Sequence, residues 1–136
     1  YTPYPKFEGD TRLPHFADKI TRQIHKTALG AESTVDFEQF ETLEEALREL
    51  REHDYVLIAL EQYPGSLSPA ECAAQLQEEF KDKPVALVIG NEIHGVKDDI
   101  LKQMDLIMEI PMQGTKESLN VSVATAIALY ALTASS

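Results

Sequence analysis

The chain has 136 residues, of which 43% are hydrophobic and 26% are charged, a composition typical of one folded domain and not of a disordered segment. Twelve Lys and Arg against 23 Asp and Glu give a formal net charge of -11, so a polyanion partner would require a local basic patch. The single cysteine, Cys72, excludes an intramolecular disulfide, and the dispersed histidines exclude a zinc site of familiar spacing. No apolar run approaches the roughly 18 residues of a membrane span, so we expect a cytoplasmic protein with no membrane partner.

The first part of the chain combines a loop with a helix. Residues 1–14 hold three of the seven prolines and predict an irregular loop. Because the chain starts at Tyr1 in a Tyr-Thr-Pro-Tyr-Pro stretch, and not at a methionine, we expect further residues before it in the whole protein. From His15 to Leu29 apolar residues recur at helical spacing, and Gly30 follows at the position of a left-handed cap, so this segment predicts an amphipathic helix.

The next segments carry three further signals. Ser33–Phe40 is short and β-prone, and Thr42-Leu-Glu-Glu45 has the spacing of a capping box that opens a helix ending near His53. Tyr55–Leu60 is a continuous apolar run that is too short for an ordinary helix. It predicts a central parallel strand covered on both faces.

The second half of the chain continues this alternation. Ser68-Pro-Ala-Glu71 supplies an N-cap, a proline at the first helical position and a glutamate at the third, so it predicts a helix start. The remaining segments predict, in chain order, a strand at Pro84–Ile89, a short helix at Lys97–Met104, a strand at Leu106–Ile110 and a helix from Ser118 to about Thr133. Apolar strands that alternate with helices predict an α/β fold, with a mostly parallel sheet and helices on both faces.

The last predicted helix is apolar nearly all round. Its apolar residues are Leu119, Val121, Val123, Ala124, Ala126, Ile127, Ala128, Leu129, Tyr130 and Leu132. A helix of this kind has to be buried on most sides, and a domain of this size has little interior. We therefore expect a two-fold homodimer in which part of this helix is covered by its mate.

Two loops follow predicted strands at the carboxyl edge of the sheet, where ligands bind in open parallel sheets. In the first, Val88-Ile-Gly-Asn-Glu-Ile-His-Gly95, two glycines bracket a glutamate, and glycines let a backbone approach a ligand closely. A plain strand-to-helix turn explains this fragment equally well. Neither GxGxxG nor GxxxxGK[ST] occurs, so a dinucleotide or P-loop site has no support.

The second loop belongs to the segment Ile110-Pro-Met-Gln-Gly-Thr-Lys-Glu-Ser-Leu-Asn-Val-Ser-Val-Ala124. It places backbone amides, a hydroxyl and a carboxamide at the start of a helix. Taken alone, Ser118 as a helix N-cap and Asn120 as a solvated first-turn residue is the simpler interpretation. The two loops together favour a binding site.

These two loops resemble the second and third motifs of the SpoU, or TrmH-like, branch of the SPOUT RNA methyltransferases. The resemblance rests on Leu-Val-Ile-Gly-Asn-Glu-Ile-His-Gly (87–95), on 110–124 and on the spacing between them. The opening Tyr-Thr-Pro-Tyr-Pro and Lys-Thr-Ala-Leu-Gly-Ala-Glu (26–32) are also similar to the first half of the family's catalytic domain. The resemblance thus identifies residues 1–136 as one such domain.

The resemblance implies a SPOUT-type fold whose C-terminal segment is threaded through a loop to form a trefoil knot, and a homodimer that packs the last helix against its mate. It implies S-adenosylmethionine as cofactor, no metal, and transfer of the methyl group to a ribose 2′-hydroxyl of tRNA or rRNA. The alternative hypothesis is a non-catalytic knotted module that binds cofactor or RNA in an assembly role.

The resemblance also implies roles for individual residues. The cofactor-binding set comprises Ala59, Leu60, Gly90, Asn91, Gly95, Ile110, Met112, Ser118 and Leu119. Glu92, Ser118 and Asn120 would shape the catalytic corner and hold the ribose or a catalytic arginine.

In this family the catalytic arginine belongs to a first motif of the Asn-x-x-x-x-x-Arg type, which these 136 residues lack. The four arginines of the chain occur in other contexts, at Arg12, Arg22, Arg48 and Arg51. We expect the motif, with the first strand and helix of the sheet, just before Tyr1. The one modest basic face predicted comprises Lys19, Arg22 and Lys26 on the first helix, and it fits a solvated surface better than an RNA contact.

Overall fold

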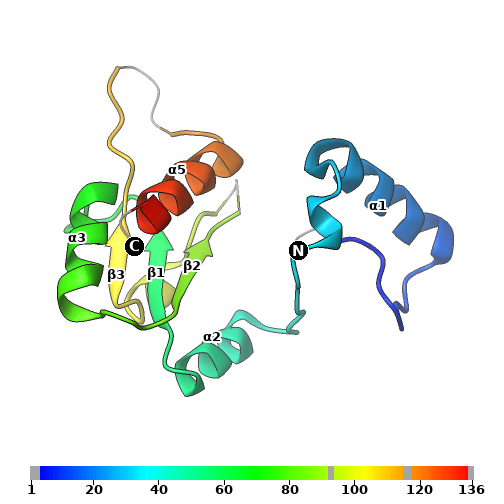
Figure 1. The fold of residues 1–136 in the computed structure, drawn as a ribbon, viewed down its shortest axis with the longest axis horizontal. Helices are drawn as coiled ribbons and strands as arrows, with labels where there is room; N and C mark the ends of the chain where they lie inside the picture. Colours follow the sequence, from blue (N-terminus) through cyan, green and yellow to red (C-terminus); the bar gives the residue numbers. More distant parts are fainter. Residues whose placement is uncertain (1–3, 92–93, 115–117, 135–136) are drawn as a thin grey trace. The chain divides into compact units, whose positions relative to one another are not determined.

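The chain folds into two compact units, Tyr1–Glu41 and Thr42–Ser136, whose elements are labelled in Figure 1. The structure is a computed structural model that describes residues 4–91, 94–114 and 118–134. The predicted alternation of helices and parallel strands is found in the second unit, and the first unit holds the predicted amphipathic helix.

The predicted helix of the first unit is confirmed as α1, Pro14–Ala28, with a proline in its first turn. The left-handed cap lies one residue earlier than predicted, at Leu29, which has φ 53° and donates its backbone N–H to the carbonyl of His25. Gly30 is also left-handed, with φ 100°, and it leads into the 3-10 helix η1, Ala31–Ser33. Two consecutive left-handed residues therefore turn the chain out of α1.

The β-prone segment Ser33–Phe40 forms no strand, so that prediction is wrong. Its apolar side chains are exposed, with Val35 at 66%, and the described part of this unit holds no strand with which it could pair. Instead, the ring of Phe37 packs with Tyr4 and Phe7 at centroid distances of 6.5 and 6.1 Å. Phe37 has a high strand propensity but packs in an aromatic cluster. A segment of this kind forms a strand only where a neighbouring strand is available to pair with it.

Arg12 holds the loop before α1 together. Its guanidinium donates to both carboxylate oxygens of Asp10 and to the carbonyls of Tyr4 and Pro5, and it lies 3.8 Å from the centre of the Tyr4 ring. These contacts stabilise the ionised carboxylate and lower the pKa of Asp10 from 3.8 to about 2. The irregular loop predicted for residues 1–14 is therefore, from Tyr4 onward, an ordered one.

The second unit is built on a three-stranded parallel sheet in the order β2-β1-β3 (Figure 1). The strands are β1, Val56–Leu60; β2, Val85–Ile89; and β3, Leu106–Met108. Ile58 of β1 pairs with Leu87 on one side and Leu106 on the other, so the prediction that β1 is the central strand is confirmed.

The described part of this unit contains four helices: α2, Leu43–Glu52; α3, Pro69–Glu79; α4, Asp98–Leu101; and α5, Val121–Ala134. Both predicted capping boxes are confirmed by reciprocal hydrogen bonds. Thr42 Oγ1 accepts from the Glu45 N–H at 3.2 Å, and Ser68 Oγ accepts from the Glu71 N–H at 3.4 Å. The glutamates in turn accept from the backbone N–H groups of Thr42 and Ser68.

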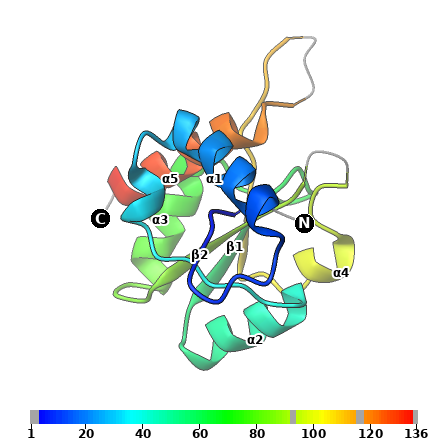
Figure 2. The same ribbon diagram turned by 90° about the vertical axis from the view of Figure 1, so that its right-hand side faces the viewer.

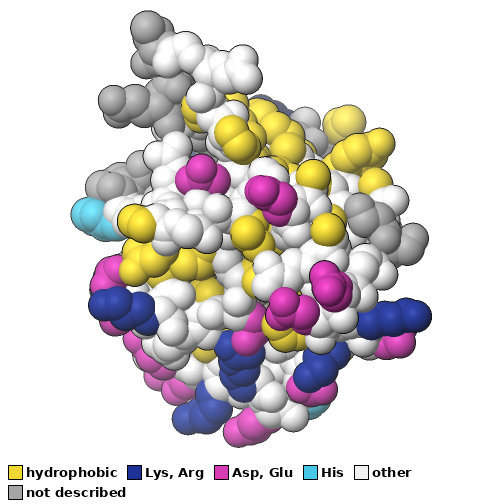
Figure 3. All heavy atoms as spheres, turned by 90° about the vertical axis from the view of Figure 1, so that its left-hand side faces the viewer, with side chains coloured by type: hydrophobic (Ala, Val, Ile, Leu, Met, Phe, Trp, Pro, Cys, Tyr) yellow, Lys and Arg dark blue, Asp and Glu magenta, His cyan; other side chains and the backbone are white. Residues whose placement is uncertain are grey.

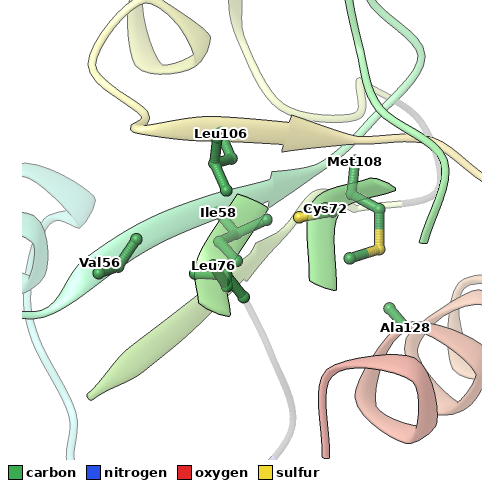
Figure 4. Packing of buried hydrophobic residues seen from close by; sticks show 7 residues of the cluster. All are labelled: Val56, Ile58, Cys72, Leu76, Leu106, Met108 and Ala128. Carbon is green, nitrogen blue, oxygen red and sulfur yellow. The ribbon is translucent and has the colours of Figure 1, made fainter. Parts of the chain in front are cut away.

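The core lies on both faces of the sheet, because successive side chains of β1 point to opposite sides. On one face, Val56 and Ile58 pack with residues of α3 and α5, as Figure 4 shows for Cys72, Leu76 and Ala128. On the other face, buried side chains of β1 meet those of α2, α4 and the segment before α4: Leu47, Leu57, Ala59, Val96, Ile100 and Leu101. Figure 2 shows α3 to one side of β1 and β2 and α4 to the other, as predicted.

Three predicted segments are shorter than expected by two or more residues. The short helix ends at Leu101, and β3 ends at Met108 because its partner β1 ends at Leu60, which pairs with Met108. The last helix starts at Val121, and Ser118 is not its N-cap. Asn120 takes that place, since its carbonyl accepts from the Ala124 N–H and its Oδ1 from the Ser122 N–H.

Helix α5 is less buried within one chain than its composition predicts. Ala128 is its one fully buried residue, whereas the exposure of Val123, Ile127, Leu129 and Tyr130 ranges from 39% to 75%. Over the described parts of the chain, no helix combines the length and hydrophobicity that crossing a bilayer requires.

Candidate functional site

A pocket of about 520 Å³ lies at the carboxyl edge of the sheet in the second unit. Its walls come from the ends of β1 and β2, the segment after β3 and the start of α5. The lining residues are Leu60, Glu61, Gln62, Ile89, Gly90, Asn91, Gly95, Glu109, Ile110, Met112, Ser118, Leu119, Asn120, Val121 and Ala124. This volume is within the range of roughly 300–1,000 Å³ that is usual for small-molecule sites.

The structure brings most of the predicted site residues together in this pocket. From the predicted cofactor-binding set, it is lined by Leu60, Gly90, Asn91, Gly95, Ile110, Met112, Ser118 and Leu119. Ala59 is absent from the lining, because its side chain is 0% exposed and packs in the core cluster with Val96 and Ile100. Of the three predicted catalytic residues, Ser118 and Asn120 line the pocket, and Glu92 lies outside the described residues.

The loop after β2 is both a tight turn and a close backbone approach. Asn91 stabilises the turn, since its carbonyl accepts from the Gly95 N–H at 3.0 Å and its Oδ1 from the His94 N–H at 2.8 Å. A Cβ atom on Gly90 would lie only 2.2 Å from the carbonyl carbon of Gly95. Gly95 itself has φ +57°, a conformation that L side chains rarely adopt. Both glycines are therefore required by the local backbone.

The loop before α5 presents Ser118, Leu119 and Asn120 to the pocket. Leu119 is half-buried, whereas Ser118 and Asn120 are exposed. Because Asn120 Oδ1 caps α5, the carboxamide has a fixed orientation at the helix start. The predicted cap at Ser118 is therefore wrong. Asn120, which was expected in the first turn, caps the helix and also lines the pocket.

Sequence reasoning missed several lining residues, among them two acidic ones. Glu61 directly follows the last residue of β1, and Glu109 directly follows β3. Their positions just beyond two strand ends are the signal that could have identified them. Among the lining residues that the structure describes, the charged side chains are both carboxylates, which favour a ligand with positive charge.

Arg12 and Arg51 form hydrogen bonds away from the pocket. Arg12 is bound to Asp10 in the first unit. Arg51 donates to Asp105 Oδ2 at 2.6 Å and to the Gln103 carbonyl at 2.7 Å, at the edge of the sheet opposite to the pocket. No arginine is among the described residues that line the pocket, and these residues also contain no group of three side chains able to hold a metal ion.

Comparison with known proteins agrees with this geometry. Residues 11–130 match the model of the SpoU rRNA Methylase family. The chain belongs to this family. The resemblance of the two loop motifs is therefore confirmed, together with a mixed α/β fold built on a parallel sheet.

Individual relatives give the same result. The chain is 33% identical over 111 residues to a 23S rRNA (guanosine-2'-O-)-methyltransferase of Nitrosomonas europaea, which covers 82% of this chain and 40% of the relative. Over 48 residues it is 54% identical to a tRNA (guanosine(18)-2'-O)-methyltransferase of Aquifex aeolicus, covering 35% of this chain and 23% of that one. The chain thus spans less than half the length of these curated relatives.

Solved structures of family members are also similar. The TrmH/SpoU tRNA modifying enzyme of A. aeolicus has a TM-score of 0.66 at 28% identity, with 94% of this chain and 57% of that chain covered. An AdoMet-bound rRNA methyltransferase from Sinorhizobium meliloti has a TM-score of 0.69 at 25% identity, with 91% and 42% covered.

Proposed function

We propose that the whole protein is an S-adenosylmethionine-dependent methyltransferase that methylates a ribose 2′-hydroxyl of tRNA or rRNA. The observation that carries this proposal is the pocket, which gathers both loop motifs of the family at one edge of the sheet. The relatives also support this proposal, because they are named as 2'-O-methyltransferases of rRNA and tRNA. In addition, a structural neighbour was solved with AdoMet bound.

The residues present fit this cofactor. The pocket offers an apolar surface for the flat adenine ring, formed by Leu60, Ile110 and Leu119. At Gly90 and Gly95 the backbone itself lines the pocket, because neither residue has a side chain. The carboxylates of Glu61 and Glu109 make the pocket favourable for a cationic group. When bound, S-adenosylmethionine supplies an activated methyl group on a positively charged sulfur.

The protein's own contribution is positioning and removal of one proton. We propose that Ser118 and Asn120 hold the ribose, or an arginine that acts on its hydroxyl, beside the cofactor. Asn120 suits this role, because capping of α5 holds its carboxamide in place at the rim of the pocket. Alignment of the two reacting groups alone can supply several kcal/mol. The arginine would come from a first motif before Tyr1, and the role of Glu92 remains a prediction.

We propose that the functional form is a homodimer packed through α5 with a C-terminal trefoil knot. Val123, Ile127 and Tyr130 support the dimer, because their spacing places them on one side of the helix and all three are exposed within the chain. The trefoil knot is proposed because the chain belongs to the SpoU family. A cytoplasmic location follows if the substrate is tRNA or rRNA.

RNA binding requires local positive charge on an acidic protein. Lys19, Arg22 and Lys26 are exposed on α1 and are the candidates within the described residues. On the face of the molecule drawn in Figure 3, basic side chains lie among acidic ones and form no separate basic patch. We therefore assign the RNA contact to the side of α1 that carries Lys19, Arg22 and Lys26, together with parts of the whole protein beyond this chain.

The first test is calorimetric titration of S-adenosylmethionine and S-adenosylhomocysteine into this chain. We expect micromolar binding that is lost in a Leu119→Trp variant, which fills the pocket, and kept in an Ala74→Trp variant on the exposed side of α3. The whole protein is then incubated with labelled cofactor and total RNA, followed by nucleoside analysis. Absence of binding by the folded chain contradicts the proposal, and binding without methyl transfer by the whole protein supports the non-catalytic module instead.

A further inference from the structure

The side chain of Glu61, an acidic residue of the pocket, is hydrogen-bonded to the backbone of the protein itself. We infer that Glu61 is a positioning residue that holds Gly95 and Val96, after β2, in their ligand-binding arrangement. This inference rests on the proposed function, because it deepens the role of the same pocket. It is carried by two hydrogen bonds to the carboxylate, by one from the Glu61 backbone N–H, and by the close packing of Gly95 against the carboxylate.

Glu61 connects three segments that are distant in sequence. Its backbone N–H donates to the Met108 carbonyl at 3.0 Å, which ties the end of β1 to the end of β3. Its side-chain Oε2 accepts from the Val96 N–H at 2.9 Å, across 35 residues. Its Oε1 accepts from the N–H of the next residue, Gln62, at 3.0 Å. The side chain of Glu61 thus connects the end of the central strand to the end of the loop after β2.

Close packing adds to these hydrogen bonds. A Cβ atom on Gly95 would lie 2.2 Å from Glu61 Oε2, so the carboxylate occupies the space next to this glycine. Gly90 in turn lies directly against the backbone of Gly95. Val96 fixes the end of the loop, because its side chain is buried in the core cluster with Ala59 and Ile100. The backbone that lines the pocket is therefore held between the core and Glu61.

A carboxylate suits this position better than an amide. Both of its oxygens accept a hydrogen bond from a backbone N–H, and an ionised carboxylate is a pure acceptor that forms stronger, charge-assisted bonds. Glutamine would keep one acceptor and turn its NH₂ group toward the other N–H. Because both oxygens are engaged by backbone, the geometry favours positioning over direct contact with a ligand.

The test uses Glu61→Ala and Glu61→Gln variants of this chain, with amide hydrogen exchange at Val96 and calorimetric binding of S-adenosylmethionine as readouts. For Glu61→Ala we expect faster amide exchange at Val96 and a higher Kd for S-adenosylmethionine. Each should change by roughly tenfold or more, because a charge-assisted hydrogen bond is lost. For Glu61→Gln, which keeps one acceptor, we expect most of both effects to be recovered.

A Glu109→Gln variant is the matched control for charge. It removes one carboxylate from the same pocket, and the described residues show no side-chain hydrogen bond from Glu109 to the loop. We expect exchange at Val96 to stay at the wild-type rate in this variant. Faster exchange in Glu109→Gln as in Glu61→Ala would overturn the inference, because the effect would then belong to pocket charge.

Two other outcomes overturn it. Unchanged exchange at Val96 in Glu61→Ala would show that the carboxylate does not hold the loop, and equal loss of binding in the Gln and Ala variants would indicate direct contact with the ligand.

If the wild-type chain binds no S-adenosylmethionine, the proposed function fails, and exchange in the ligand-free chains still decides the loop-holding role. If Glu61→Ala does not fold, the same two readouts on Glu61→Gln and Glu61→Asp decide it.

Discussion

Gly90 and Gly95 are in direct backbone contact, because a Cβ atom on Gly90 would lie 2.2 Å from the carbonyl carbon of Gly95 and 2.5 Å from its Cα. The two residues bracket the loop after β2, and both line the pocket. The atoms that a larger residue at position 90 would meet are backbone atoms, which no rotamer change can move. The shape of the pocket therefore depends on the absence of two side chains.

A Gly90→Ala variant tests this dependence. We expect it to lower the free energy of unfolding by about 1–3 kcal/mol, the usual cost of overpacking, and to weaken S-adenosylmethionine binding because the loop has to shift. Gly65→Ala is the matched control, since Gly65 has φ +86° with nothing within 4 Å of a Cβ atom and is not part of the pocket lining. It should cost about 1–2 kcal/mol and keep cofactor binding. Wild-type binding by Gly90→Ala would contradict the prediction.

Asp105 fixes the opposite edge of the sheet. Its Oδ2 accepts from the backbone N–H of the buried residue Leu57 at 2.7 Å and from Arg51 Nη1 at 2.6 Å. We expect Asp105→Ala to lower the free energy of unfolding by about 2 kcal/mol, because a buried N–H loses its partner. Arg51→Ala should cost less than about 1 kcal/mol, because this ion pair is exposed. Urea unfolding measures both, and equal losses would contradict this explanation.

The ion pair between Asp10 and Arg12 predicts a pH dependence of the first unit. The pKa of Asp10 is lowered from 3.8 to about 2, chiefly by its side-chain hydrogen bonds with Arg12. Because the folded pKa is below the unfolded one, the stabilisation is present above pH 3.8 and is lost as the pH falls toward 2.

A carboxyl-carbon NMR titration measures this pKa directly. We expect the carboxyl of Asp10 to titrate near 2 in the wild type and near the ordinary value of 3.8 in an Arg12→Gln variant. A wild-type titration near 3.8 would show that the ion pair does not persist in solution.

Cys72 is a probe of the core around α3. It is 0% exposed, and burial raises the pKa of its thiol to about 11, so the reactive thiolate is scarce at pH 8. We expect Ellman's reagent to react very slowly with the native chain and rapidly in denaturant. Because Cys72 is the only cysteine, the whole signal reports on this site. Rapid reaction of the native chain would contradict the packing of α3 on the sheet.

The exposed side of α5 predicts the oligomeric state. Tyr130 is 75% exposed within the chain, so a Tyr130→Asp substitution should leave the fold of the subunit intact and disrupt a dimer packed through this helix. Light scattering coupled to gel filtration should give twice the mass of one chain for the wild type and the mass of one chain for this variant. Ala74→Asp, an exposed position on α3, adds the same charge and should remain dimeric. A monomeric wild type would contradict the proposed dimer.

Local signals in the sequence determined most of the secondary structure and the family. The capping boxes at Thr42 and Ser68 depend on residues three apart, and the apolar run at Val56–Leu60 depends on neighbouring residues, so both could be recognised without a tertiary structure. The pocket-lining glycines, Gly90 and Gly95, belong to a short motif and were predicted for the same reason.

Features that depend on a distant partner were decided only by the tertiary structure. Ser33–Phe40 has strand propensity but no strand to pair with, and β3 ends where β1 ends. Glu61 is an ordinary glutamate in the sequence, and its role appears only when Val96, 35 residues away, donates a hydrogen bond to it. Hydrogen bonds and packing between distant segments form only after the chain has closed the loops between them, and the spacing of neighbouring residues carries no record of that closure.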